Sequence, residues 1–212
     1  MPRGAHLETE VKVLVPDLDA VRRRLDADPG ARCTTPRVHE YNIRYDDAAG
    51  ALAPAGIVLR LRRDVPVGGG AERARLTYKA PAAPISAGAS TRLEYEVEVG
   101  DFAEMDAILR RLGYHPYWVY EKFRTTYTVA GAEVVLDETP FGAFVEAEGA
   151  PEAIEAALAR LGLQNGHRLL ESYAALFERV RASLGLTFRD LTFENFRGVT
   201  VPISAFSPPG GV

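Results

Sequence analysis

The chain has almost none of the residues that build disulfides and metal–thiolate sites. Only one of its 212 residues is a cysteine, Cys33, so an internal disulfide cannot form and a cysteine-based zinc site is excluded. No apolar run reaches the ~20 residues that a membrane-spanning helix needs. Residues 1–8 also lack the apolar stretch of a secretory signal. We therefore expect a cytoplasmic protein with no membrane partner.

Runs of basic residues are missing as well. The chain holds 25 Lys and Arg against 29 Asp and Glu, a net charge of −4, so we expect no nucleic-acid partner. A protein with this balance can still bind an anion if its basic residues gather in one place. Apolar residues make up 47% and charged residues 25% of the chain, which is typical of an ordinary soluble globular protein.

What the sequence does contain is a series of short segments with alternating apolar and polar residues. This pattern predicts eight strands, near residues 7–14, 38–46, 56–64, 73–80, 91–99, 117–129, 132–138 and 143–149. Four amphipathic helices are expected at 17–25, 101–112, 151–161 and about 171–184. Ala130 and Gly131 indicate a tight hairpin turn. Residues 185–212 leave two possibilities open, a packed segment or a trailing tail.

Charges recur at every second position of several predicted strands, and alternate side chains of a strand share one face. The repeated charges are Glu8, Glu10 and Lys12; Arg60 and Arg62; Arg92, Glu94, Glu96 and Glu98; Lys122 and Arg124; and Glu146 and Glu148. Lys79 and Asp137 add single charges near strand ends.

For any one strand, a charged face in water is the simpler interpretation. Together, however, like charges on one face repel each other unless opposite charges lie near. We therefore predict an α+β fold with a closed eight-stranded antiparallel β-barrel, charged faces inside and amphipathic helices outside. The basic groups would bind a polyphosphate, and the carboxylates hard ions such as Mg²⁺ or Mn²⁺. A lining that neutralises itself is the alternative.

Several of these segments resemble, in order, the motifs of the CYTH superfamily, also called triphosphate tunnel metalloenzymes. They are residues 8–12 (E-x-E-x-K), 45–46 (Y-D), 59–62 (L-R-x-R), 77–81, 91–99, 121–124 (K-x-R), 136–149 and 172–173. The resemblance covers roughly residues 6–180. It implies a triphosphate tunnel domain over residues 1–184, followed by a tail, 185–212, of unknown role.

The resemblance also implies an enzyme with a small-molecule triphosphate substrate and Mg²⁺ or Mn²⁺ as cofactor. Carried over by position, the catalytic residues are Glu8, Glu10, Lys12, Glu146 and Glu148. The substrate-binding residues are Lys12, Arg60, Arg62, Lys79, Arg92, Lys122 and Arg124. The metal ligands are Glu8, Glu10, Glu94, Glu96, Asp137, Glu146 and Glu148.

The resemblance does not decide the reaction. Hydrolysis of an inorganic or nucleoside triphosphate is one hypothesis, and a class IV adenylate cyclase that makes cyclic AMP and pyrophosphate is the second. A non-catalytic polyphosphate-binding module is the third. Thiamine triphosphate is disfavoured because Val58 stands where those enzymes tend to carry a tryptophan, and we expect Trp118 to pack in the core. Tyr173 either closes one tunnel end or packs on the barrel, and a homodimer stays open.

Overall fold

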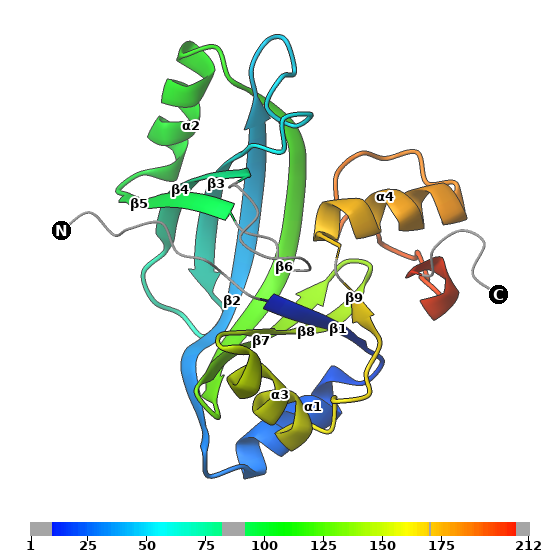
Figure 1. Cartoon of the computed structure of the whole chain (residues 1–212). Helices are drawn as coiled ribbons and strands as arrows, with labels where there is room; N and C mark the ends of the chain where they lie inside the picture. The colour runs from blue at the N-terminus through cyan, green and yellow to red at the C-terminus, as the bar shows by residue number, and fades with distance from the viewer. Residues whose placement is uncertain (1–9, 82–91, 170, 207–212) are drawn as a thin grey trace.

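The computed structural model describes residues 10–81, 92–169 and 171–206, and it shows an α+β fold built on one large sheet (Figure 1). The strands are β1 (Glu10–Val15), β2 (Ala31–Asp46), β3 (Val58–Pro66), β4 (Arg73–Pro81), β5 (Arg92–Val99), β6 (His115–Val129), β7 (Ala132–Thr139), β8 (Gly142–Glu148) and β9 (Arg168–Leu169). They pair antiparallel in the order β5-β4-β3-β2-β6-β7-β8-β1-β9.

All eight predicted strands are present, and their alternation was the correct signal. β9 was not predicted, because two residues are too short to show a period. β2 begins at Ala31 rather than at 38, since bulges interrupt its pairing with β6 between Cys33 and Val38. The hairpin between β6 and β7 turns at Ala130 and Gly131, as predicted. Both have positive φ, 51° and 83°, as tight hairpin turns require.

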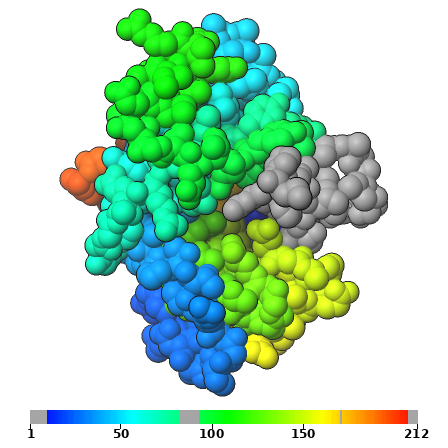
Figure 2. All heavy atoms as spheres, turned by 90° about the vertical axis from the view of Figure 1, so that its left-hand side faces the viewer, coloured from blue at the N-terminus to red at the C-terminus, as the bar shows by residue number. Residues whose placement is uncertain are grey.

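The long strands β2 and β6 connect two lobes (Figure 1). One lobe holds β3, β4, β5 and the helix α2 (Phe102–Arg111), and the other holds β1, β7, β8 and the helices α1 (Leu18–Ala27) and α3 (Pro151–Arg160). Seen from the side, the surface is hollowed between the lobes (Figure 2).

The predicted closure of the barrel is not confirmed. Within the described ranges the sheet ends at β5 on one side and at β9 on the other, with no hydrogen bonds joining these ends. The reason lies at β1, whose edge away from β8 pairs with β9 at Lys12 and Val13. That stretch of edge is therefore not available to β5, and the described sheet is curved but open.

The four predicted helices are present, with ends shifted by one or two residues. α1, α2 and the last helix, α4 (Tyr173–Leu184), begin with an Asp or Ser whose side chain accepts a backbone N–H of the first turn, and α3 begins with Pro151. Gly185 ends α4 at a φ of 64°. None of the helices in the described residues is long and apolar enough to span a membrane.

Three apolar clusters hold the elements together. α1 and α3 pack against Val13, Leu136 and Val145 of the sheet, and α2 packs against β2 and β3, which confirms the prediction of helices outside the charged face. α4 departs from it. Its Phe177 packs with Trp118 and Tyr120 of β6, side chains that share a strand face with Lys122. α4 therefore lies across one end of the charged face rather than outside it.

The segment that follows α4 packs on the domain. Leu191 is 1% exposed and forms a parallel bridge with Tyr120 of β6. Phe196 and Phe206, the latter at the end of the 3-10 helix η1 (Ile203–Phe206), enter the same apolar cluster as α4. Trp118 belongs to this cluster, so its predicted place in the core is confirmed. Residues 185–206 are thus a folded part of the domain.

Candidate functional site

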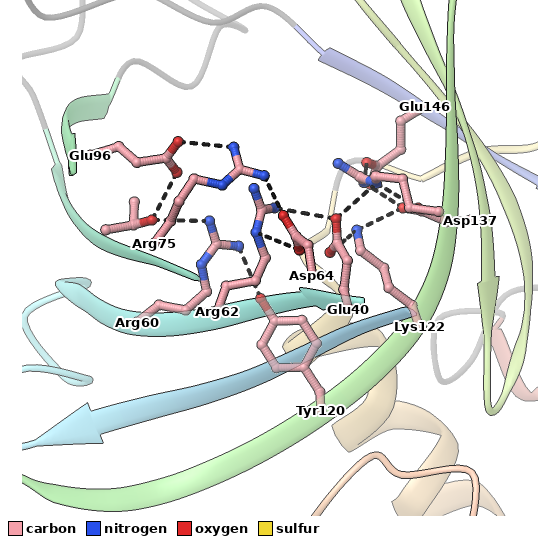
Figure 3. A network of polar contacts seen from close by, with 12 residues as sticks. Glu40, Arg60, Arg62, Asp64, Arg75, Glu96, Tyr120, Lys122, Asp137 and Glu146 are labelled. Atoms are coloured by element: carbon pink, nitrogen blue, oxygen red, sulfur yellow. Dashed lines mark hydrogen bonds and ion pairs between the residues drawn. The ribbon is translucent and has the colours of Figure 1, made fainter. Parts of the chain in front are cut away.

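The site is a belt of charged side chains on the concave face of the sheet. Residues directly opposite each other in an antiparallel pair share a face, and the register places Lys12 opposite Glu146, and Glu40 opposite both Lys122 and Asp64. Charges from strands far apart in sequence thereby converge (Figure 3). The belt has one half on β6, β7, β8 and β1 and a second half on β3, β4 and β5, with Glu40 of β2 between them.

Asp137 is the centre of the first half. It is fully buried and accepts bonds from Lys122 Nζ (2.9 Å), from Arg124 (2.7 and 2.5 Å) and from the Tyr173 hydroxyl (2.9 Å). Burial by itself raises the pKa of this carboxyl, but Arg124 and Lys122 outweigh burial and hold the pKa well below its ordinary value. Asp137 is therefore ionised and acts as the counter-ion of two cations.

Glu146 and Lys12 lie beside this centre. Glu146 binds Arg124 Nη2 (2.6 Å) and Lys12 Nζ (3.1 Å), and Lys12 also donates to Glu10 (3.0 Å). Burial and the charge of Asp137 raise the pKa of Glu146 despite these cations. Burial lowers the pKa of Lys12, but Glu146 and Glu10 outweigh it and the net pKa is raised. The ammonium of Lys12 therefore stays charged.

Tyr173 contacts both lysines of this half. Its ring lies 4.7 Å from Lys12 Nζ and 5.2 Å from Lys122 Nζ, and its hydroxyl donates to Asp137. Burial, followed by the charges of Asp137 and Glu146, raises its pKa well above the ordinary value, so it remains a proton donor. The sequence left two roles open for Tyr173, and the structure shows features of both: its ring also packs against Phe141 and Phe144 of the apolar cluster.

The second half is rich in arginine. Arg75 of β4 bridges Asp64 (2.5 Å) and Glu96 (3.1 Å). Arg60 of β3 donates to the Tyr120 hydroxyl (3.1 Å) and to Thr77 (3.3 Å). At the rim, Lys79 pairs with Glu94 at 2.7 Å.

Glu40 joins the two halves. It is 2% exposed, and its carboxylate lies 3.3 Å from Arg62 Nη1, 3.6 Å from Lys122 Nζ and 3.8 Å from Arg124 Nε. Burial raises its pKa, but these cations outweigh burial and lower the pKa to about 2. Glu40 is thus a buried anion among three residues predicted to bind phosphate.

Sequence reasoning missed Glu40, Asp64 and Arg75. Glu40 was detectable, because it alternates with His39 and Tyr41 on a predicted strand. Asp64 and Arg75 were detectable in the same way, since Asp64 continues the alternation of Arg60 and Arg62, and Arg75 shares a strand face with Lys79. The register of β3 with β4, which sets Arg62 opposite Arg75, shows which of these charges meet.

Several buried polar atoms in the belt lack a hydrogen-bond partner among the described residues, and Asn42 and Arg60 are two examples. Asn42 of β2 is 0% exposed, and neither its amide nitrogen nor its amide oxygen has a hydrogen-bond partner there. The same is true of Arg60 Nε. A buried amide left without partners costs about 1–3 kcal/mol. The belt is therefore built to receive a polar ligand or ordered water at this place.

The predicted metal ligands are not brought together as one set. In the residues that the structure describes, no three His, Cys, Asp or Glu side chains are placed to hold a metal ion. Asp137 is taken up by cations, and Glu94 and Glu96 pair with β4 in the other half. Glu8 and the side chain of Arg92 lie outside the described residues. The metal assignments therefore stay predictions.

A smaller acidic group remains suited to a hard cation. Glu10 and Glu148 lie directly opposite each other on β1 and β8, one position from the pair of Lys12 and Glu146 along the strand face. The Glu10 side chain is 43% exposed, so its oxygens are open to solvent. Carboxylate oxygens are the ligands that Mg²⁺ and Mn²⁺ prefer, so the donor chemistry of the pair Glu10 and Glu148 fits such an ion. The neighbouring Glu146 is bound by Arg124 and Lys12.

The sequence comparison assigns this curved sheet with its charged concave face to a known protein family. The model of the CYTH domain matches residues 6–172. Because this match covers most of the 212 residues, the chain belongs to the CYTH domain family. The match ends one residue before α4, so α4 and the segment after it lie beyond the matched domain. No curated protein sequence matches the chain.

Solved structures share the fold. A "putative adenylate cyclase" from Vibrio parahaemolyticus is 20% identical with a TM-score of 0.68, and the match covers 82% of this chain and 99% of that one. PH1819 from Pyrococcus horikoshii is 26% identical (TM-score 0.64; 81% and 98% covered). HpAC1 from Hippeastrum, described with a dominant triphosphatase activity, is 22% identical (TM-score 0.56; 81% and 95% covered).

Proposed function

We propose that this chain is an enzyme that binds a small-molecule triphosphate in the charged hollow, with Mg²⁺ or Mn²⁺, and hydrolyses it. The observation that carries the proposal is the convergence of lysines and arginines from β1, β3, β4 and β6 on one concave face, beside the unpartnered amide of Asn42. Membership in the CYTH family supports it. So does the triphosphatase activity described for HpAC1, a protein of the same fold.

In this proposal the phosphate oxygens replace carboxylates as partners of the basic side chains. Arginine forks match phosphate oxygens, and lysines act as point charges. Lys12, Arg60, Arg62, Lys79, Arg92, Lys122 and Arg124 hold the phosphates, as the resemblance implies. Held in this way, the chain of phosphates lies in line for attack, and the cations stabilise the charge that develops on the leaving diphosphate.

The acidic residues divide into two groups. Asp137 positions Lys122 and Arg124 and keeps them charged, because it binds both. Glu8, Glu10, Glu146 and Glu148 would hold the divalent ion. When bound, such an ion supplies a water of lowered pKa and neutralises phosphate charge. The proposal also includes closure: a ligand that contacts both halves of the belt draws them together into the closed barrel.

The decisive experiment is a substrate panel with identified products. Tripolyphosphate, ATP, GTP and thiamine triphosphate are each incubated with Mg²⁺ or Mn²⁺. We expect phosphate release from at least one of the first three, lost in Lys122→Met. The matched control is Arg37→Met, because Arg37 is also a paired cation but binds Glu138 on the opposite face of β7. Phosphate release that is no greater than that of K122M, for every substrate, would contradict the proposal.

The same panel separates the alternatives. The fold shared with the Vibrio protein favours a cyclase as the second candidate, and ATP would then yield cyclic AMP and pyrophosphate instead of ADP and phosphate. Tight tripolyphosphate binding without turnover of any substrate would identify a polyphosphate-binding module instead.

A further inference from the structure

Glu40 has a position that its neighbours in the belt do not share. It lies in the middle of β2, with Asp64 of β3 and Lys122 of β6 as its direct neighbours across the sheet. Its carboxylate is the anion that contacts Arg62 from the arginine-rich half as well as Lys122 and Arg124 from the other half (Figure 3). A phosphate bound between Arg62 in one half and Lys122 and Arg124 in the other would compete with Glu40 for these three cations.

The contacts of Glu40 are long for hydrogen bonds. Arg62 donates one long hydrogen bond to Oε1 at 3.3 Å, and the contacts with Lys122 and Arg124, at 3.6 and 3.8 Å, are ion pairs without a hydrogen bond. Oε2 has no hydrogen-bond partner among the described residues. By contrast, Asp137 binds its cations at 2.5–2.9 Å. The carboxylate of Glu40 therefore binds three cations weakly with only two oxygens, whereas a phosphate group has more oxygens to bind them.

We propose that Glu40 is an internal anion that competes with the substrate's phosphate for Arg62, Lys122 and Arg124, and so sets the affinity of the site for triphosphate. The inference rests on the proposed function. It makes Glu40 a specificity-determining residue: its charge stabilises the empty site and repels the bound triphosphate. A carboxylate with a structural role alone would, on removal, weaken the fold and weaken ligand binding with it. Our proposal predicts the opposite sign for binding.

The test is direct binding of tripolyphosphate, measured by calorimetry with EDTA present, to the wild type, Glu40→Gln and Glu138→Gln. Glu138 is the matched control because it also pairs with two arginines, Arg22 and Arg37, but faces away from the belt. We expect E40Q to bind at least about tenfold more tightly than the wild type, which corresponds to about 1.4 kcal/mol. E138Q should bind within about twofold of the wild type.

A second measurement tests the inference even if the Glu40→Gln substitution destabilises the protein. The rise in melting temperature on adding tripolyphosphate should be larger for E40Q than for the wild type, because the ligand then replaces the missing anion. If E40Q is unfolded without ligand, added tripolyphosphate should restore the folded circular dichroism spectrum, and no restoration would overturn the inference.

The remaining outcomes separate the two proposals. A wild type that binds tripolyphosphate while E40Q binds equally or more weakly overturns the role of Glu40 and leaves the proposed function standing. Absence of binding to both proteins in EDTA overturns the role of Glu40, whereas the proposed function is decided by the product panel with Mg²⁺ or Mn²⁺. Binding to E40Q but not to the wild type supports the role of Glu40 strongly.

Discussion

Asp137 shows what one buried carboxylate does for this protein. It is 0% exposed and binds Lys122, Arg124 and Tyr173. Removing one partner of a buried ion cluster leaves the other charges uncompensated, at about 3–5 kcal/mol. We therefore expect Asp137→Asn to lower the free energy of unfolding by about that amount in urea titrations. Asp19→Asn, whose side chain is 74% exposed, is the control. A loss of less than about 1 kcal/mol for D137N would show that the cluster does not depend on this charge.

The pKa of Glu40 makes a pH-dependent contribution to stability. The value is about 2 in the folded protein against an ordinary 4.5, so the unfolded chain takes up the proton first as the pH falls. The stabilisation is complete above pH 4.5 and is lost as the pH falls toward 2, on the order of 3 kcal/mol in total. The free energy of unfolding of E40Q should therefore fall less steeply than that of the wild type between pH 4.5 and 2. Parallel curves in chemical denaturation would contradict this prediction.

At the scale of elements, the segment after α4 binds the strand β6, which carries part of the belt. The Leu191 carbonyl accepts the backbone N–H of Glu121, and the Leu191 N–H donates to the carbonyl of Val119. The Asp190 carboxylate accepts the backbone N–H of Val119, so the segment holds the stretch of β6 that carries Tyr120 and Lys122. The belt residues of β6 are thus fixed by a part of the chain beyond the family match.

Leu191→Ala should therefore affect both stability and binding. Leu191 is 1% exposed, and truncating a buried leucine costs about 2–5 kcal/mol. We expect thermal unfolding to show this loss, together with weaker tripolyphosphate binding, because β6 loses its support. Ile203→Ala is the control within the same segment, since Ile203 is 64% exposed and should cost less than about 0.5 kcal/mol. Equal melting temperatures for the two variants would show that the segment does not brace the domain.

At the scale of the whole molecule, the lining largely neutralises itself. Lys12, Lys122 and Arg124 are paired with carboxylates in one half, and Arg62, Arg75 and Lys79 in the other. The sequence analysis kept this possibility as an alternative, and the structure has many of these pairs. Under the proposed function, a triphosphate displaces carboxylates when it binds, and the proposed role of Glu40 predicts that the affinity depends on this displacement.

If a ligand closes the sheet, its open side should become protected. We expect amides of β4 and β5 to exchange hydrogen more slowly when tripolyphosphate and Mg²⁺ are added, because closure reduces local opening. Amides of α1, which packs on the outer face, should not change. Protection at Lys122 and its neighbours without any at β5 would mean that the ligand binds to an open sheet.

The sequence by itself determined most of the elements and several members of the charged face. Alternating residues identified eight strands, and caps and apolar periodicity identified four helices, because these signals are local. Charges at every second position also identified Arg60, Lys122 and Glu146 as members of one charged face. Such patterns hold wherever a strand has one apolar and one polar side.

Only the tertiary structure decided which charges meet. Glu40 lies among Arg62, Lys122 and Arg124, and Arg75 bridges Asp64 and Glu96, because of register across distant strands. That α4 covers one end of the belt follows from packing. β9 pairs with part of the edge of β1 over two residues, which is too short for a periodic pattern in the sequence. A shift of one residue in register reverses every side chain of a strand, and the sequence of a single strand does not contain that information.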